Sequence, residues 1–326
     1  MKRFLIAGFL LGWLALLTTS CQRESGKIVL KAGHVLDTSH PSHKALEFMA
    51  KRLAERSGGR VELRIYPSGQ LGGNRELIEQ VQLGIITMTP TSTGSLESFK
   101  PELGVFSLPY IFRDSIHYWQ VLEGETGKDL LDCTEVGLKG LCYFDAGSRS
   151  FYMKDAQLRT PDDLAGKKIR VMQNRTSMMM IDALGGSPTP ISFGELYSAL
   201  QQGVVDGAEN NPPSFLTSGH HEVCKYYTLD EHTRIPDLLA MSEKKWRNFP
   251  PDLQKMLTEV AAETSQYQRK IWKKMSNNAL ATLKEKNVTI ITPDKSPFME
   301  KVQELHGSYR GTATGTLIKR IKEQTE

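Results

Sequence analysis

Two arginines at strand-associated positions are the side chains in this chain best suited to bind a carboxylate. Arg170 lies between Ile169 and Val171, and alternate residues of a strand point to opposite faces, so Arg170 faces away from the two apolar side chains. Arg149 follows a second apolar run, 141–144. A planar guanidinium can match a carboxylate with two parallel hydrogen bonds. The alternative is that each arginine simply lies at the surface. This alternative is weakened because two arginines occur at strand-associated positions in neighbouring units.

Polar side chains follow several other apolar runs. His34 closes the run 27–35, Ser92 belongs to the hydroxyl-rich segment 89–94, and Asn210 and Asn211 follow the run 204–209. Hydroxyl and amide groups both donate and accept hydrogen bonds, as a polyhydroxylated ligand requires. The alternatives remain open: a structurally satisfied histidine near a strand end, a simple turn at 89–94, and two turn-forming asparagines before Pro-Pro.

Strands alternating with helices must position these groups. The runs 27–35, 61–65 and 85–89 have strand patterns, and amphipathic segments at 45–53 and 74–84 separate them. This order indicates βαβ units and a mostly parallel sheet, in which ligands bind beyond the carboxyl ends of the strands. We therefore expect His34 and the segment containing Ser92 at the edge of a cleft.

Two further patterns extend this α/β prediction. Thr160-Pro161-Asp162-Asp163 has the composition of a helix start, and 174–184 has helical spacing. From Pro251 to about Lys286 no glycine or proline interrupts an apolar periodicity. A helix of this length would outreach a single small domain, so we expect it to be shared by two lobes.

The composition is that of an ordinary globular protein. The chain has 326 residues, 39% of them hydrophobic and 24% charged, which is enough for about two domains. The formal charge of +4 is modest and the basic residues are scattered, so nucleic-acid binding has no support.

The N-terminus has the pattern of an export signal. Lys2 and Arg3 precede an apolar run, 4–17, that is too short to span a membrane, and Cys21 follows a small residue. This pattern predicts a signal at 1–21 and lipidation of Cys21, with a simple soluble export signal as the alternative. The mature chain is then expected to work outside the cytoplasm, in the periplasm.

No pattern predicts a metal or a cofactor. The cysteines at 133, 142 and 224 form no CxxC, and the histidines at 220, 221 and 232 lack zinc-peptidase spacing. Cys133 and Cys142 are close enough in sequence to form a disulfide, but spacing alone cannot decide this.

Four longer stretches resemble the solute-binding proteins of TRAP (tripartite ATP-independent periplasmic) transporters. They are 66–72, 106–110, 163–171 and 196–207, and the similarity covers essentially the whole mature chain. The resemblance implies two α/β lobes that are joined by crossing strands, spanned by one long helix and able to close on a ligand. We place the first lobe at 27–147 and 236–275, and the second at 148–235 and 276–326.

The resemblance also implies roles for individual residues. The arginine at the position of Arg170 binds the ligand carboxylate in this family, and the one at Arg149 commonly assists. The aromatic residue at Phe193 packs on the ligand and the amide at Asn210 closes the site. Ser92 stands where a sialic-acid-binding member has an acidic residue, which disfavours sialic acid.

Within the family, 208–213 and 230–232 look most like members that bind hexuronates such as glucuronate or galacturonate. We therefore expect a protein that captures a carboxylated sugar and delivers it to membrane permease subunits, without a cofactor. Hydroxyl partners are expected among His34, Gln173, Asn174, Asn210 and Asn211.

Three alternative functions remain open. The first is binding of another organic acid, namely a C4-dicarboxylate, an aldonate or sialic acid. The second is a binding protein of the same two-lobed architecture that serves ABC uptake or signalling. The third is an exported enzyme using Asp145, Glu209 or a histidine as acid or base. The chain has no G-x-S-x-G or HExxH motif, so we expect no enzymatic activity.

Overall fold

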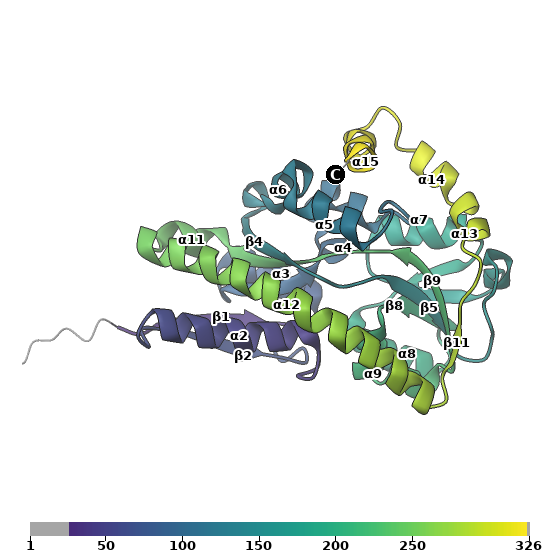
Figure 1. The fold of residues 1–326 in the computed structure, drawn as a ribbon, viewed down its shortest axis with the longest axis horizontal. Coiled ribbons are helices and arrows are strands. Elements are labelled where there is room, and N and C mark those ends of the chain that lie inside the picture. Colours follow the sequence, from purple (N-terminus) through teal and green to yellow (C-terminus); the bar gives the residue numbers. More distant parts are fainter. Residues whose placement is uncertain (1–25, 325–326) are drawn as a thin grey trace, which may run out of the picture.

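A computed structural model describes residues 26–324, which form two β-sheets covered by helices (Figure 1). The first sheet has the order β2-β1-β3-β10-β4, in which β1, β2 and β3 are parallel and β10 is antiparallel to both its neighbours. Its strands are β1 (Ile28–Gly33), β2 (Val61–Tyr66), β3 (Met88–Ser92), β4 (Leu138–Phe144) and β10 (Asp237–Ser242).

The second sheet has the order β11-β9-β5-β8-β6-β7. Strands β6, β7 and β8 run parallel to one another, and β5 is antiparallel to both β8 and β9. Its strands are β5 (Arg149–Met153), β6 (Lys168–Val171), β7 (Ser187–Pro190), β8 (Gly207–Asn210), β9 (Tyr226–Thr233) and β11 (Thr289–Ile291).

Two extended connections join the sheets. The chain leaves the first sheet after Phe144 and enters the second at Arg149, and it returns between Thr233 and Asp237. Asp237 pairs with Phe144 and Arg149 pairs with Thr233, so the two connections run side by side. Each sheet with its helices therefore forms one lobe, and the predicted two-lobed α/β fold is confirmed.

Helices cover both sheets. The α-helices are α2 (Pro41–Arg56), α3 (Asn74–Leu83), α4 (Thr93–Leu96), α5 (Ser115–Glu123), α6 (Glu125–Leu131), α7 (Arg175–Ala183), α8 (Leu196–Gln201), α9 (Pro212–Thr217), α10 (His220–Val223), α11 (Glu243–Asn248), α12 (Pro251–Glu285), α13 (Ser296–Lys301), α14 (Gln303–Gly307) and α15 (Ala313–Glu323). The 3-10 segments are η1 (Pro101–Ser107), η2 (Thr134–Val136), η3 (Pro161–Leu164) and η4 (Phe193–Glu195).

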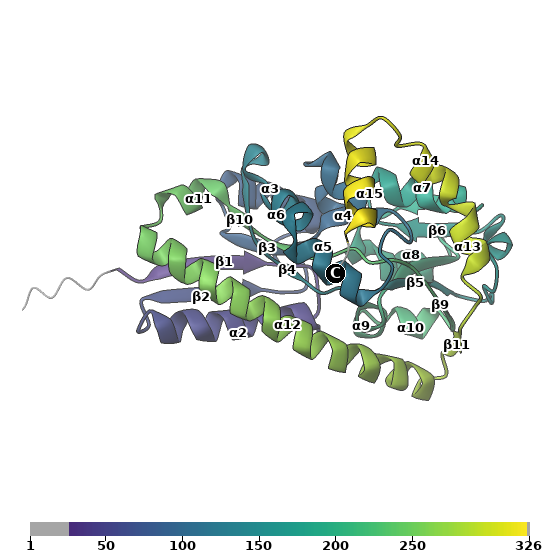
Figure 2. The same ribbon diagram turned by 45° about the horizontal axis from the view of Figure 1, so that its top comes forward.

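The long helix α12 links the two lobes. It has 35 residues, and at 1.5 Å per residue it is about 50 Å long. Its first part packs against α2 and β4 of the first lobe, and a later part packs against α9 of the second (Figure 2). The helix predicted from 251 to about 286 is confirmed.

Two local predictions were wrong. The segment after Thr160 was expected to start a helix and has a capping box with Asp163, but it forms only the 3-10 turn η3, because Gly166 follows with φ of 72° and β6 begins at Lys168. The strand expected at 85–89 is β3 at Met88–Ser92, so Ser92 ends a strand instead of lying in a loop.

The C-terminal segment contacts both lobes. Helix α13 packs against β9 and η3, and α14 packs against α7, all in the second lobe. Helix α15 instead packs against η1 and α6 of the first lobe, where Arg320 and Asp129 form an ion pair at 2.7 Å. Because of these contacts we propose that α15 belongs to the first lobe, although our predicted boundaries placed it in the second.

Cys133 and Cys142 are both buried free thiols, so they do not form the disulfide considered from the sequence. Among residues 26–324, no helix has the length and apolar character needed to cross a bilayer. The predicted export signal and Cys21 lie outside the described residues.

Candidate ligand-binding site

Two adjoining hollows lie between the lobes. The inner cavity has a volume of about 70 Å³ and its walls come from both lobes. The outer cleft has about 650 Å³ and shares five lining residues with the inner cavity. These shared residues are Val35, Asn74, Arg170, Met172 and Phe193.

Arg170 lies on β6 of the second lobe and lines both hollows. Only 2% of the residue is exposed. Its Nε donates to the carbonyl oxygen of Ile191 at 2.8 Å, which fixes the orientation of the guanidinium, and its buried Nη1 has no hydrogen-bond partner. Burial lowers the pKa of Arg170 to about 10. Within residues 26–324 no acidic side chain forms a salt bridge with it, so this cation lacks a counter-ion in the folded chain.

Arg149 begins β5 and lines the inner cavity, but its charge is already matched. Its Nε donates to Glu209 Oε2 at 2.5 Å, and its Nη2 donates to Glu209 Oε1 at 2.8 Å and to the Glu209 carbonyl oxygen at 2.9 Å. Its Nη1 donates to Asn210 Oδ1 at 2.9 Å. Arg149 is thus a neutralised, oriented donor, and Arg170 is the cavity-lining cation without a partner.

Glu209 joins Arg149 to a second buried ion pair. The Nε2 of His232 lies 3.5 Å from Glu209 Oε2, and its Nδ1 lies 2.6 Å from Asp230 Oδ2. Burial opposes the protonated histidine, but the two carboxylates outweigh burial and raise its pKa to about 9. Burial also opposes ionisation of Glu209, yet Arg149 and His232 hold its pKa at about 2. The alternating charges of this row stabilise one another behind the cavity wall.

Asn210 and Asn211 both line the inner cavity, where β8 ends and α9 begins. Asn210 Oδ1 accepts from Arg149 and from the Asn211 backbone N–H at 2.9 Å. Asn211 Oδ1 accepts from the Ser214 N–H at 2.9 Å as the N-cap of α9. Because these oxygens are occupied, the Nδ2 groups are the parts of the two amides left for a ligand.

A histidine not predicted from the sequence connects the lobes at this cavity. His40 Nδ1 accepts from the Ser42 N–H at 3.1 Å, which leaves the ring proton on Nε2 to donate to Ser214 Oγ at 3.2 Å. Burial lowers the pKa of His40 to about 3, so the ring is neutral. His40 belongs to the first lobe and Ser214 to the second, so this hydrogen bond crosses the cleft.

The structure separates the other predicted site residues. Phe193 lines both hollows, Ser92 lines the inner cavity and also caps α4, and Gln173 lines the outer cleft. Asn174 and His34 line neither hollow.

Asn174 and His34 instead have partners within the fold. Asn174 is buried, and its Oδ1 caps α7 by accepting from the Ser177 N–H at 2.7 Å, while its Nδ2 is without a partner. His34 is buried, its Nδ1 accepts from the Leu36 N–H at 3.2 Å and its Nε2 lies 2.9 Å from His43 Nδ1. These contacts favour the structural alternative for His34.

His40, Asn74 and Asp237 line the inner cavity but were not predicted. His40 and Asn74 stand at the beginnings of α2 and α3, and Asp237 begins β10. The only sequence signal for these three residues was their position at the start or end of an element. Helix starts and strand ends meet at the cleft of an α/β sheet, so residues at such positions are candidates for the site.

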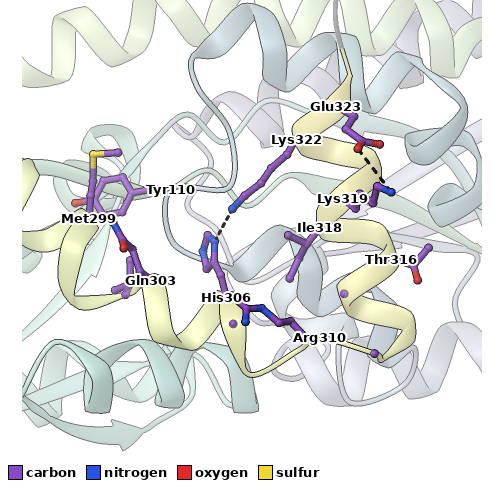
Figure 3. A pocket seen from close by; sticks show the side chains of 14 residues that line it. Tyr110, Met299, Gln303, His306, Arg310, Thr316, Ile318, Lys319, Lys322 and Glu323 are labelled. Atoms are coloured by element: carbon purple, nitrogen blue, oxygen red, sulfur yellow. Dashed lines mark hydrogen bonds and ion pairs between the residues drawn. The ribbon is translucent and has the colours of Figure 1, made fainter.

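A larger hollow lies elsewhere on the described part of the chain. A groove of about 1060 Å³ separates α13 and α14 from α15 and is lined by Tyr110, His306 and Lys322 among others (Figure 3). It is larger than the two hollows between the lobes, but it lacks a buried cation without a partner. We therefore assign the ligand to the inner cavity and the outer cleft.

A cleft between two α/β lobes, with a buried cation inside it that lacks a counter-ion, defines a solute-binding protein. The chain belongs to family 7 of the bacterial extracellular solute-binding proteins, whose model matches residues 32–312. The members of this family bind solutes for transport. The prediction of a binding protein is therefore confirmed over the alternative of an exported enzyme. The expected action outside the cytoplasm is confirmed by the same family.

Three solved TRAP periplasmic solute-binding proteins are similar to this chain. One from Pseudomonas putida F1, with bound D-glucuronate, is 36% identical with a TM-score of 0.88 over 92% of this chain and 98% of that one. One from Xanthobacter autotrophicus Py2, with bound β-D-galacturonate, is 35% identical with a TM-score of 0.86 over 90% and 99%. One from Sulfurospirillum deleyianum DSM 6946, with bound succinate, is 33% identical with a TM-score of 0.88 over 92% and 100%.

Proposed function

We propose that this protein captures a hexuronate such as glucuronate or galacturonate between its lobes and delivers it to the membrane permease of a TRAP transporter. The observation that carries the proposal is the buried guanidinium of Arg170, with Nη1 unsatisfied and no acidic partner among residues 26–324. A ligand carboxylate supplies the missing charge and acceptors at once. Arg149, held by Glu209, offers a further oriented donor to the same ligand.

Polar groups around Arg170 suit the hydroxyls of a sugar. Asn210 and Asn211 present amide nitrogens, and Asn74 and Ser92 face the inner cavity from the first lobe. Phe193 supplies an apolar face on which a sugar ring can pack. This combination of one anchoring cation with many neutral donors and acceptors favours a monocarboxylate that carries several hydroxyls.

A C4-dicarboxylate is the second candidate, because the similar protein from Sulfurospirillum deleyianum holds succinate. Aldonates and sialic acid remain further alternatives among organic acids. All of these ligands share the carboxylate that Arg170 requires, so binding measurements must separate them.

Isothermal titration calorimetry with purified protein tests the proposal. The panel comprises glucuronate, galacturonate, gluconate, succinate and sialic acid, with the methyl ester of glucuronate as a control that removes only the ligand charge. We expect saturable binding of at least one hexuronate, unchanged ligand after incubation, and no binding of the ester. Binding of succinate alone would contradict the hexuronate proposal, and equal binding of the ester would contradict the role of Arg170.

We further propose that Cys21 carries a lipid that tethers the protein to a membrane. Its position after a short apolar run and a small residue supports this. Expression of the full chain, followed by membrane fractionation and intact mass measurement, tests it against Cys21→Ser. An unmodified wild-type protein in the soluble fraction would contradict lipidation.

A further inference from the structure

Asp237 is a carboxyl group in the cavity wall that the fold leaves without a salt bridge. It is the first residue of β10, where it pairs with Ser92 of β3 on one side and Phe144 of β4 on the other. It lines the inner cavity together with Ser92 and His40 of the first lobe. Among the described residues no lysine, arginine or histidine forms a salt bridge with it.

The opposite wall of the same cavity carries the positive charge. Arg149, Arg170 and Asn210 all come from strands of the second lobe. Arg149 is paired with Glu209, so its charge is not free to neutralise Asp237. The inner cavity is therefore polarised, with an unmatched cation on one lobe and an unmatched acid on the other.

Burial adds to this isolation. It raises the pKa of Asp237 to about 7, while Arg149 acts in the opposite direction and Asp145 in the same direction. A desolvated carboxyl without an ionic partner is costly to the fold, and such groups are concentrated at functional sites.

We propose that Asp237 determines specificity: it binds a ligand hydroxyl and excludes any ligand that carries a second carboxylate. The inference rests on the proposed function, because it assumes that the ligand carboxylate lies on Arg170. Arg170 and Asp237 both line the cavity of about 70 Å³, so a ligand anchored at Arg170 shares this cavity with the Asp237 carboxyl. At pH 8, where Asp237 is ionised, a hydroxyl there forms a charge-assisted hydrogen bond, whereas a second carboxylate meets a like charge in a poorly solvated site.

Calorimetric titration of wild type and Asp237→Asn at pH 8 with glucuronate and with succinate tests this proposal. The substitution preserves shape and hydrogen-bonding capacity but removes the charge. We expect glucuronate affinity to fall about tenfold and succinate affinity to rise, so that the ratio of the two affinities changes by at least about 30-fold. Asp155→Asn, which removes an exposed acid of the second lobe, serves as the matched control and should leave the ratio unchanged.

An unchanged ratio in Asp237→Asn would overturn the proposal. If that variant does not fold, as judged by circular dichroism, Asp237→Ser is titrated in the same way and carries the same expectation for the ratio. Failure of the wild type to bind any hexuronate would instead contradict the proposed function. The two failures are distinguishable, because this one is seen in the wild-type protein and the other only in the Asp237 variants.

Discussion

Glu97 of the first lobe accepts two hydrogen bonds from Thr176 of the second lobe. Its Oε1 lies 3.0 Å from the Thr176 backbone nitrogen and 2.9 Å from Oγ1. Thr176 stands in the first turn of α7, where a negative charge also interacts favourably with the helix dipole. Together with the hydrogen bond between His40 and Ser214, this contact joins the two lobes directly.

Glu97→Ala should weaken ligand binding by about tenfold or more, because a charge-assisted hydrogen bond contributes about 1.5–3 kcal/mol and this one joins the two lobes, so we expect it to favour the closed state. Small-angle scattering of the ligand-free variant should show a larger radius of gyration than the wild type. Glu97→Gln keeps the accepting oxygen and should lie between the two. Identical scattering and affinity in Glu97→Ala would show that the contact does not control closure.

Arg170→Met should abolish the ligand-induced rise in melting temperature and yet stabilise the ligand-free protein by about 1 kcal/mol or more. The reason is that the wild type buries a charge without a counter-ion, and replacing such a charge with an apolar side chain of similar volume removes its desolvation cost. Thermal denaturation with and without glucuronate measures both effects. A destabilised ligand-free variant would mean that Arg170 has a structural partner.

Arg149→Met should have the opposite effect on the ligand-free protein. It leaves Glu209, which is 1% exposed, beside His232 but without its main partner, and breaking a buried pair in this way costs about 3–5 kcal/mol. Urea denaturation of Arg149→Met, Glu209→Gln and the double variant forms a double-mutant cycle. Strictly additive losses would disprove the coupling.

The pKa of Asp237 predicts a pH-dependent difference in stability between wild type and Asp237→Asn. The folded-state pKa of about 7 lies above the ordinary value of 3.8, so the folded chain holds a proton that the unfolded chain releases between these limits. The contribution of Asp237 to stability therefore falls as pH rises from about 4 to about 7 and stays low above it. Relative to the wild type, Asp237→Asn should gain stability over this range and show its largest advantage at pH 8. Urea denaturation at pH 4, 6 and 8 measures this difference, and a constant value would contradict the shifted pKa.

Periodicity predicted the parts of the fold that depend on local sequence. The length of α12 follows from an uninterrupted apolar pattern, and the strand character of β6, with Ile169 and Val171 buried, follows from alternation. Position on β6 was also enough to select Arg170. Its lack of a counter-ion, however, depends on which acidic residues the fold brings near it.

The missed features depend on contacts between distant segments. Arg149 meets Glu209 because β5 and β8 pair with Phe151 opposite Glu209, which makes the two charged residues diagonal neighbours on one face. No local pattern specifies that register across 60 residues. In the same way, position after a strand favoured His34 in the sequence, and only the path of the chain after β1 makes His40 the cavity-lining histidine.

The C-terminal segment links the two lobes outside the inner cavity and the outer cleft. Helix α14 packs on α7 of the second lobe and α15 packs on the first lobe, and between them runs a short turn in which Gly311 has φ of 77°. His306 of α14 also donates from Nε2 to the Pro109 carbonyl oxygen of the first lobe at 2.7 Å. When the lobes separate, this hydrogen bond must break or the turn must absorb the relative displacement of its two ends. A donor and an acceptor fluorophore on α14 and α15 would convert that displacement into an optical signal, so the chain already has the layout of a genetically encoded sensor for its solute.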